Sequence, residues 1–104
     1  MRDIYSAYPI RAHAYLMPLF DEENAWLLTG VEVAYDERGK GVARELMRRV
    51  LTDADAEGVT LYLSVEPDGS LGSLEASELM DWYERLGFVR MSESDYGMVR
   101  QPQG

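Results

Sequence analysis

Apolar residues between positions 43 and 54 recur at steps of three and four, the spacing that brings side chains to one face of an α-helix. Gly58 follows this run, and a glycine that can adopt a left-handed conformation commonly ends a helix. A second helix is predicted from Ser73, a residue type that caps helix N-termini, to Gly87. The apolar positions that support the two helices are Ala43, Leu46, Met47, Val50, Leu51 and Ala54 in the first, and Leu74, Met80, Trp82, Tyr83 and Leu86 in the second.

In the rest of the chain, segments rich in branched and aromatic residues alternate with polar turns, which is typical of strands. Segments 11–20 and 25–34 enclose the short polar turn 21–24, so they predict a hairpin. Pro18 has no N–H to donate to a ladder and therefore indicates an edge or a bulge. The predicted strands are residues 4–10, 11–20, 25–34, 59–65, 88–91 and 97–100.

The order of these elements predicts a mixed α/β fold with a β-α-β unit at its centre. A crossover of this kind is right-handed and makes strands 25–34 and 59–65 parallel. The chain has 104 residues, 46% of them hydrophobic and 28% charged, which predicts one globular domain over residues 1–104. No stretch approaches the roughly 18 apolar residues of a membrane span, and no signal-peptide pattern is present. We therefore expect a cytoplasmic protein with no membrane partner.

Cysteine is absent and histidine occurs once, although both residue types are common in catalytic and metal-binding sites. The chain has no cysteine, which excludes disulfides, thiol nucleophiles and thiolate zinc sites. His13 is the single histidine, so sites built from two histidines are excluded as well, and we expect it on the surface of a strand. The sequence therefore predicts no metal site.

Charge is distributed unevenly. The formal net charge is −9, which disfavours direct binding of nucleic acid and suits a cationic acceptor. Yet residues 38–49 contain five basic side chains and one acidic one, Glu45. Such a cluster is either a solvated helix face or a local anion site on an acidic body.

The loop before the first helix favours the anion site. A helix N-terminus offers unpaired backbone N–H groups and about half a positive charge, and glycines let a ligand approach that backbone closely. The preceding glycine of a P-loop is missing, and neither G-x-G-x-x-G nor G-x-S-x-G occurs. The pattern therefore predicts a pyrophosphate site of a different kind, whose candidate residues are Arg38, Gly39, Lys40, Gly41, Val42 and Ala43.

Two motifs in this order resemble the GNAT acetyltransferase superfamily. Arg38, Gly41 and Ala43 fill the pattern R/Q-x-x-G-x-G/A between a strand and a helix. About forty residues later, Tyr83 to Phe88 fill the pattern Y-x-x-x-G-F. The resemblance covers about residues 25–100, and the compact layout is also similar to that of small phage-borne members of the family. It implies a mostly antiparallel sheet with one splayed strand pair, two main helices, and acetyl-CoA as cosubstrate.

The resemblance also implies places for the parts of acetyl-CoA. The pyrophosphate would lie on the N–H groups of residues 38–43, and the pantetheine arm would lie alongside Val31 and Val33, in a gap before the strand that ends at Val65. Arg44 and Arg48 would either reach the 3′-phosphate or belong to a solvated face.

The same resemblance implies direct attack of a primary amine on the thioester. Tyr83 would be the general acid for the leaving thiolate, or it would only pack in the core. Alternation along the strand places Glu32 on the sheet face opposite Val31 and Val33, where it could accept the proton of the amine. Glu66 is the rival for this role, and either glutamate could instead bind a cationic acceptor.

The chain has fewer residues before its central hairpin than members of the family usually have. We therefore expect an acceptor side that is open or completed by a second subunit in a homodimer. An open side favours a large acceptor, such as a protein lysine. Two alternatives stay open: a non-catalytic acyl-CoA-binding or protein-interaction module with the same fold, and an acetyltransferase for a small amine whose pocket forms only in a dimer.

Overall fold

The computed structural model describes residues 1–7, 11–34, 40–65, 76–93 and 96–103. These residues form strands and helices in the predicted order. The elements are β1 (Ile4–Ser6), β2 (Ala12–Pro18), β3 (Ala25–Val33), α1 (Val42–Glu57), β4 (Thr60–Ser64), α2 (Ala76–Arg85), β5 (Val89–Arg90) and β6 (Gly97–Arg100). The predicted cap Ser73 and the apolar Leu74 lie outside the described residues.

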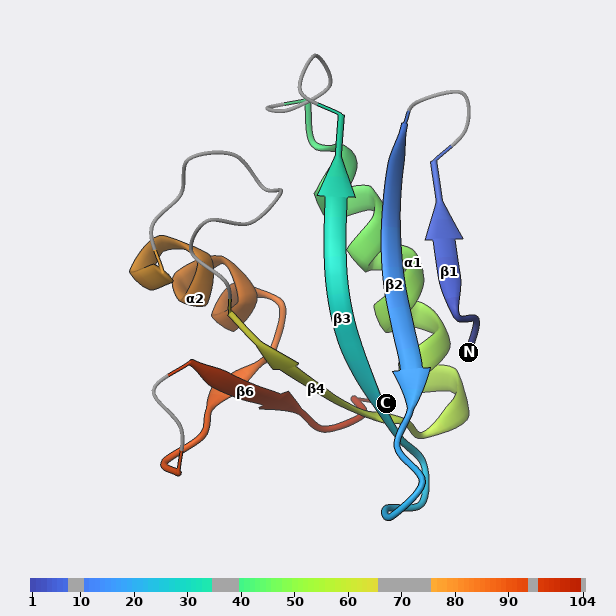
Figure 1. Ribbon diagram of the computed structural model, residues 1–104, viewed down its shortest axis with the longest axis vertical. Helices are drawn as coiled ribbons and strands as arrows, with labels where there is room; N and C mark the ends of the chain where they lie inside the picture. The colour runs from blue at the N-terminus through green and yellow to red at the C-terminus, as the bar shows by residue number, and fades with distance from the viewer. Residues whose placement is uncertain (8–10, 35–39, 66–75, 94–95, 104) are drawn as a thin grey trace.

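The strands form one mixed sheet in the order β1-β2-β3-β4-β6-β5 (Figure 1). Strands β3 and β4, which α1 connects, are parallel, and all other neighbouring strands are antiparallel. The central β-α-β unit, the hairpin of β2 and β3, and the closing hairpin of β5 and β6 are therefore confirmed. Pro18 is the last residue of β2, and the pairing of β2 with β1 ends three residues earlier, at Tyr15. The missing N–H of Pro18 therefore removes no hydrogen bond to β1. The bulge itself lies between Tyr15 and Leu16.

Strands β3 and β4 separate from each other after a short stretch of parallel pairing. Ala25–Leu28 pair with Thr60–Leu63, and β3 then continues to Val33 without pairing to β4. The end of β4 pairs with β6 instead, through Ser64 and Gly97. Figure 1 shows the resulting wedge, which opens toward the end of β3 and the start of α1. The splayed strand pair is confirmed.

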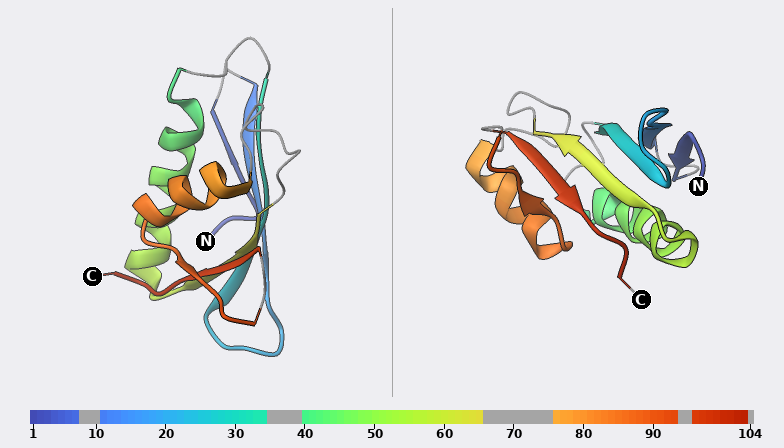
Figure 2. Two further views of the ribbon diagram at one scale, coloured as in Figure 1. Left: turned by 90° about the vertical axis from the view of Figure 1, so that its left-hand side faces the viewer. Right: turned by 90° about the horizontal axis from the view of Figure 1, so that it is seen from below.

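Both helices cover the same face of the sheet (Figure 2). The alternate residues of β2 and β3 that face them are buried, among them Ala14 and Val31. They pack against the apolar face of α1, where Leu46 and Met47 are fully buried. Burial of each such large side chain contributes roughly 1.5–3 kcal/mol. The opposite face of β2 and β3 carries no helix in the described part of the chain.

Two aspartates of α1 anchor this helix to strands on either side. Asp53 accepts a hydrogen bond of 2.5 Å from the Tyr5 hydroxyl of β1. Asp55 forms an ion pair with Arg100 of β6, whose nearest N and O atoms are 2.8 Å apart. As predicted, α1 ends at Gly58, which has a left-handed conformation with φ of 68°. Neither described helix is long and apolar enough to cross a membrane.

Candidate functional site

The start of α1 leaves the backbone N–H groups of its first turn available. Gly41 precedes the helix in a left-handed conformation, with φ of 77° and ψ of 13°, and no side chain caps the N-terminus with a hydrogen bond. A Cβ atom at Gly41 would meet nothing within 4 Å, so glycine is required there by the backbone conformation and not by crowding. The first helical hydrogen bond runs from Glu45 N to Gly41 O at 3.1 Å. The amides of the residues between them therefore have no partner within the helix.

The structure describes only part of the predicted pyrophosphate site. Arg38 and Gly39 lie outside the described residues. Lys40 and Gly41 are exposed, Val42 is buried in the core, and Ala43 is half-buried. Side-chain charge and backbone donors therefore meet at one end of α1.

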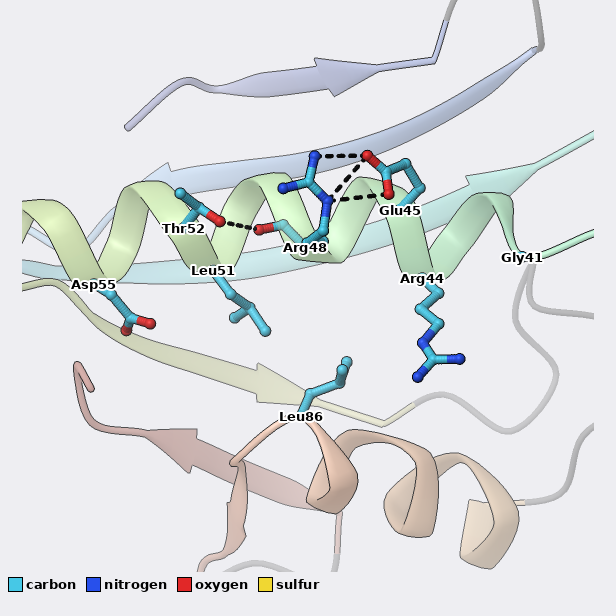
Figure 3. A pocket seen from close by; sticks show the side chains of 8 residues that line it. All are labelled: Gly41, Arg44, Glu45, Arg48, Leu51, Thr52, Asp55 and Leu86. Carbon is cyan, nitrogen blue, oxygen red and sulfur yellow. Dashed lines mark hydrogen bonds and ion pairs between the residues drawn. The ribbon is translucent and has the colours of Figure 1, made fainter. Parts of the chain in front are cut away.

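A groove of about 450 Å³ runs from this end of α1 along the helix toward the end of α2 (Figure 3). Its described lining residues are Gly41, Arg44, Glu45, Arg48, Leu51, Thr52, Asp55 and Leu86.

The two arginines of this groove differ in their partners. Arg48 donates from Nη2 and Nε to the Glu45 carboxylate at 2.7 and 3.0 Å, and these hydrogen bonds lower the pKa of Glu45. Arg44 forms no ion pair with any residue that the structure describes, and Figure 3 shows its guanidinium extended into the space between the helices. Arg44 is therefore the better candidate for binding an anion in the groove. Arg48 is exposed and paired with Glu45, which agrees with the other interpretation given for it, a solvated helix face.

Where β3 borders the wedge, its two faces carry side chains of different chemistry. Val31 and Val33 are buried toward α1, while Glu32 is exposed on the helix-free face, as alternation predicted. Glu32 accepts a hydrogen bond of 3.4 Å from the Tyr15 hydroxyl of the neighbouring strand. Glu66, the rival of Glu32, lies outside the described residues.

Tyr83 lies on the inner side of α2, with 7% of its surface exposed. Its ring packs edge-on against Trp82 and Phe88, with ring centroids 5.0 and 5.5 Å away. Burial raises the pKa of the Tyr83 hydroxyl to about 12, so the phenol stays protonated at neutral pH. Its oxygen has no hydrogen-bond partner among the described residues, and no side-chain oxygen there is both buried and unpartnered.

Three residues around this site were not predicted from the sequence. Tyr15 contacts Glu32 only because of the register between β2 and β3, which the bulge shifts. Asp55 and Arg100 lie 45 positions apart and contact each other only through the fold. One signal was available for Arg100: it follows the buried Met98 at a step of two, which places a charge on the buried face of a strand. Among the described residues, no cluster of histidine, aspartate and glutamate could hold a metal ion.

One of three comparisons with known proteins identifies a family. A family model described as acetyltransferase (GNAT) family matches residues 7–88. No curated protein matches the chain. Solved structures do match, and three of them are described in the next paragraph.

Ard1 from Thermoplasma volcanium is 19% identical, with a TM-score of 0.66 over 89% of this chain and 64% of that one. The ribosomal-protein-S18-alanine N-acetyltransferase from Escherichia coli is 20% identical, with a TM-score of 0.64 over 89% of this chain and 63% of that one. N-acetylglutamate synthase from Neisseria gonorrhoeae, complexed with coenzyme A and N-acetyl-glutamate, is 14% identical, with a TM-score of 0.65 over 89% of this chain and 23% of that one. At these identities the likeness establishes the fold, and the chain spans less than two thirds of the length of each of these proteins.

Proposed function

The chain belongs to the acetyltransferase (GNAT) family, and from this membership we propose that it transfers the acetyl group of acetyl-CoA to a primary amine by direct attack. One observation supports the proposal above all others. The wedge between β3 and β4 opens beside the uncapped start of α1, so an extended ligand can place an anionic group on the helix amides and a reactive group between the strands.

The residues present fit this cosubstrate. The pyrophosphate would bind the N–H groups of residues 38–43, with positive charge from the side chains of Arg38 and Lys40. Arg44 would contact a phosphate in the groove, because it has the free guanidinium there. The pantetheine arm would lie beside Val31 and Val33, where β3 has left the ladder with β4.

The acyl transfer needs a proton acceptor and a proton donor. We assign the first role to Glu32, with Glu66 as the alternative. The amine nitrogen attacks the thioester carbon, its C–N bond forms, and the nitrogen becomes acidic enough to release its proton to the carboxylate. The C–S bond then breaks, and the electron pair leaves with the sulfur.

We assign the role of donor to Tyr83. A phenol with a pKa of about 12 is a weaker acid than a thiol with a pKa of about 8.5, so its first contribution is a hydrogen bond to the developing thiolate. Proton transfer then completes the reaction and leaves a free thiol, an N-acetylated amine and a protonated Glu32. The tyrosinate takes up a proton from water, and the glutamate releases one.

We propose a lysine on a protein surface as the acceptor. Both helices lie on the face opposite Glu32, so a large partner can reach this carboxylate without displacing a helix that the structure describes. The net charge of −9 favours a cationic partner. A small amine in a pocket shared between two copies is the alternative.

Calorimetry with acetyl-CoA, followed by release of thiol with a panel of amines, tests the proposal. The chain has no cysteine, so it contributes no thiol to the signal. We expect binding, and thiol release with lysine-containing proteins or peptides. Binding without thiol release for any amine would indicate a non-catalytic acyl-CoA-binding module, and activity on small amines that depends on protein concentration would indicate a dimeric pocket.

A further inference from the structure

One buried guanidinium joins three elements at the far end of the groove. Arg100 of β6 has a side chain that is 4% exposed, and its Nη1 and Nη2 donate to the two carboxylate oxygens of Asp55 at 2.8 and 3.1 Å. Its Nε donates to the Leu86 carbonyl at 2.9 Å. We call Asp55, Leu86 and Arg100 the clamp. It connects α1, the turn that ends α2, and β6.

The clamp acts on the turn that follows Tyr83. The N–H groups of Leu86 and Phe88 both donate to the Tyr83 carbonyl, at 2.9 and 3.2 Å. Leu86 is therefore held at its N–H by Tyr83 and at its carbonyl by Arg100. Between Leu86 and Phe88, Gly87 has φ of 101°, and a Cβ there would lie 2.3 Å from Nε2 of Gln103, so this turn is closely packed.

The clamp also borders the groove. Asp55 lines the end away from Gly41 and Arg44, and Leu86 faces Leu51 between them (Figure 3). The place of Tyr83 relative to the start of α1 therefore depends on how the end of α2 is attached to α1.

Stability alone explains this arrangement poorly. Even for a fully buried ion pair, replacement by apolar side chains of similar volume is often neutral or stabilising, because removing two charges from water is costly. Here only the guanidinium is buried, and the Asp55 side chain is 27% exposed. A planar guanidinium with three acceptors, in contrast, defines distances and angles among the groups that it joins.

We propose that Arg100 is a positioning residue for acetyl transfer: through Asp55 and Leu86 it holds Tyr83 at the distance from the amides of α1 that the bound thioester requires. This inference rests on the proposed function. Small misplacements of a reacting group can reduce a rate by about a hundredfold without loss of binding, so the effect should appear in kcat.

Kinetics of four proteins test the inference: the natural chain, Arg100→Met, Arg100→Lys and Asp53→Asn. Asp53 is a matched control, because it anchors the same helix two residues earlier, but to Tyr5 of β1. At temperatures equally far below each melting point, we expect Arg100→Met to lower kcat about tenfold or more and to change the Kd for coenzyme A less than about threefold. Arg100→Lys, which keeps the charge, should restore part of kcat, and Asp53→Asn should keep all of it.

Amide hydrogen exchange measures positioning without activity. We expect the Leu86 and Phe88 amides to exchange faster in Arg100→Met and Arg100→Lys and to be unchanged in Asp53→Asn. Equal losses of kcat in Arg100→Met and Asp53→Asn would overturn the inference, as would full kcat or unchanged exchange in both Arg100 variants. If Arg100→Met does not fold, Arg100→Lys carries both measurements. Absence of thiol release by the natural chain would instead contradict the proposed function, and the exchange data would still show whether Arg100 holds this turn.

Discussion

Substitution of Gly41 separates coenzyme binding from helix stability. Gly41 lies at φ of 77°, a conformation that asparagine and aspartate tolerate better than other side chains, and a Cβ there meets nothing within 4 Å. Gly41→Asn and Gly41→Asp therefore have nearly the same shape and backbone cost. They differ by one negative charge at the end of α1.

That charge has opposite effects on the two properties. A carboxylate at a helix N-terminus stabilises the helix by about 0.3–1 kcal/mol, so Gly41→Asp should unfold at the same temperature as Gly41→Asn or higher. Repulsion from a pyrophosphate charge about 6 Å away costs roughly 0.7 kcal/mol in water and roughly 3 kcal/mol at an effective dielectric constant of 20. These limits correspond to about threefold and about a hundredfold in Kd.

Calorimetric titration with coenzyme A and thermal unfolding of the free proteins measure the two effects. We expect Gly41→Asp to bind between about threefold and about a hundredfold more weakly than Gly41→Asn while unfolding no earlier. The difference in affinity should shrink as salt is added, because the two charges are near the surface. Equal affinities of the two variants at low salt would refute the assignment of the pyrophosphate to the start of α1.

Four further substitutions test other parts of the structure. Tyr83→Phe should lower turnover by about a hundredfold, the lower limit for a proton donor, and leave the Kd for coenzyme A near its natural value; unchanged turnover would make Tyr83 structural. Arg100 lowers the pKa of Asp55 below its ordinary 3.8, so this pair contributes stability that is present above about pH 4 and is lost as the pH falls through the folded-state pKa. Asp55→Asn should therefore cost about 1–3 kcal/mol in urea unfolding at pH 7 and progressively less at acid pH, and a cost that does not change with pH would contradict this. Leu46→Ala, at a fully buried position, should reduce the free energy of unfolding by about 2–5 kcal/mol, whereas Arg90→Ala on the surface should change it by less than about 0.5 kcal/mol.

Sequence patterns predicted the elements well because local rules determine them. The steps of three and four in α1 and the left-handed Gly58 are properties of a short stretch of chain, and both are confirmed. The face of Glu32 followed from alternation within one strand. In these cases the structure depends on neighbours that are close in sequence.

Contacts between segments that are far apart in the sequence were harder to predict from local patterns. The bulge between Tyr15 and Leu16 shifts the register, and no local pattern shows where such an insertion falls. The partner of Arg100 is on a helix 45 residues earlier, and only the assembled sheet brings β6 next to it. The splay of β3 and β4 was expected only from the resemblance to a family, because the apolar residues of both strands continue past the point where pairing ends.

The edge-on contact between Trp82 and Tyr83 gives the molecule an intrinsic fluorescent reporter. Indole emission responds to polarity and to quenching groups nearby, and Trp82 is half-buried within 5.0 Å of the ring that we assign to the reaction. The other tryptophan, Trp26, lies on β3, so a Trp26→Phe background leaves Trp82 on α2 as the single tryptophan. Arrival and departure of an acyl thioester at Tyr83 could then be followed in a stopped-flow instrument, without a label and without a chemical modification of the chain.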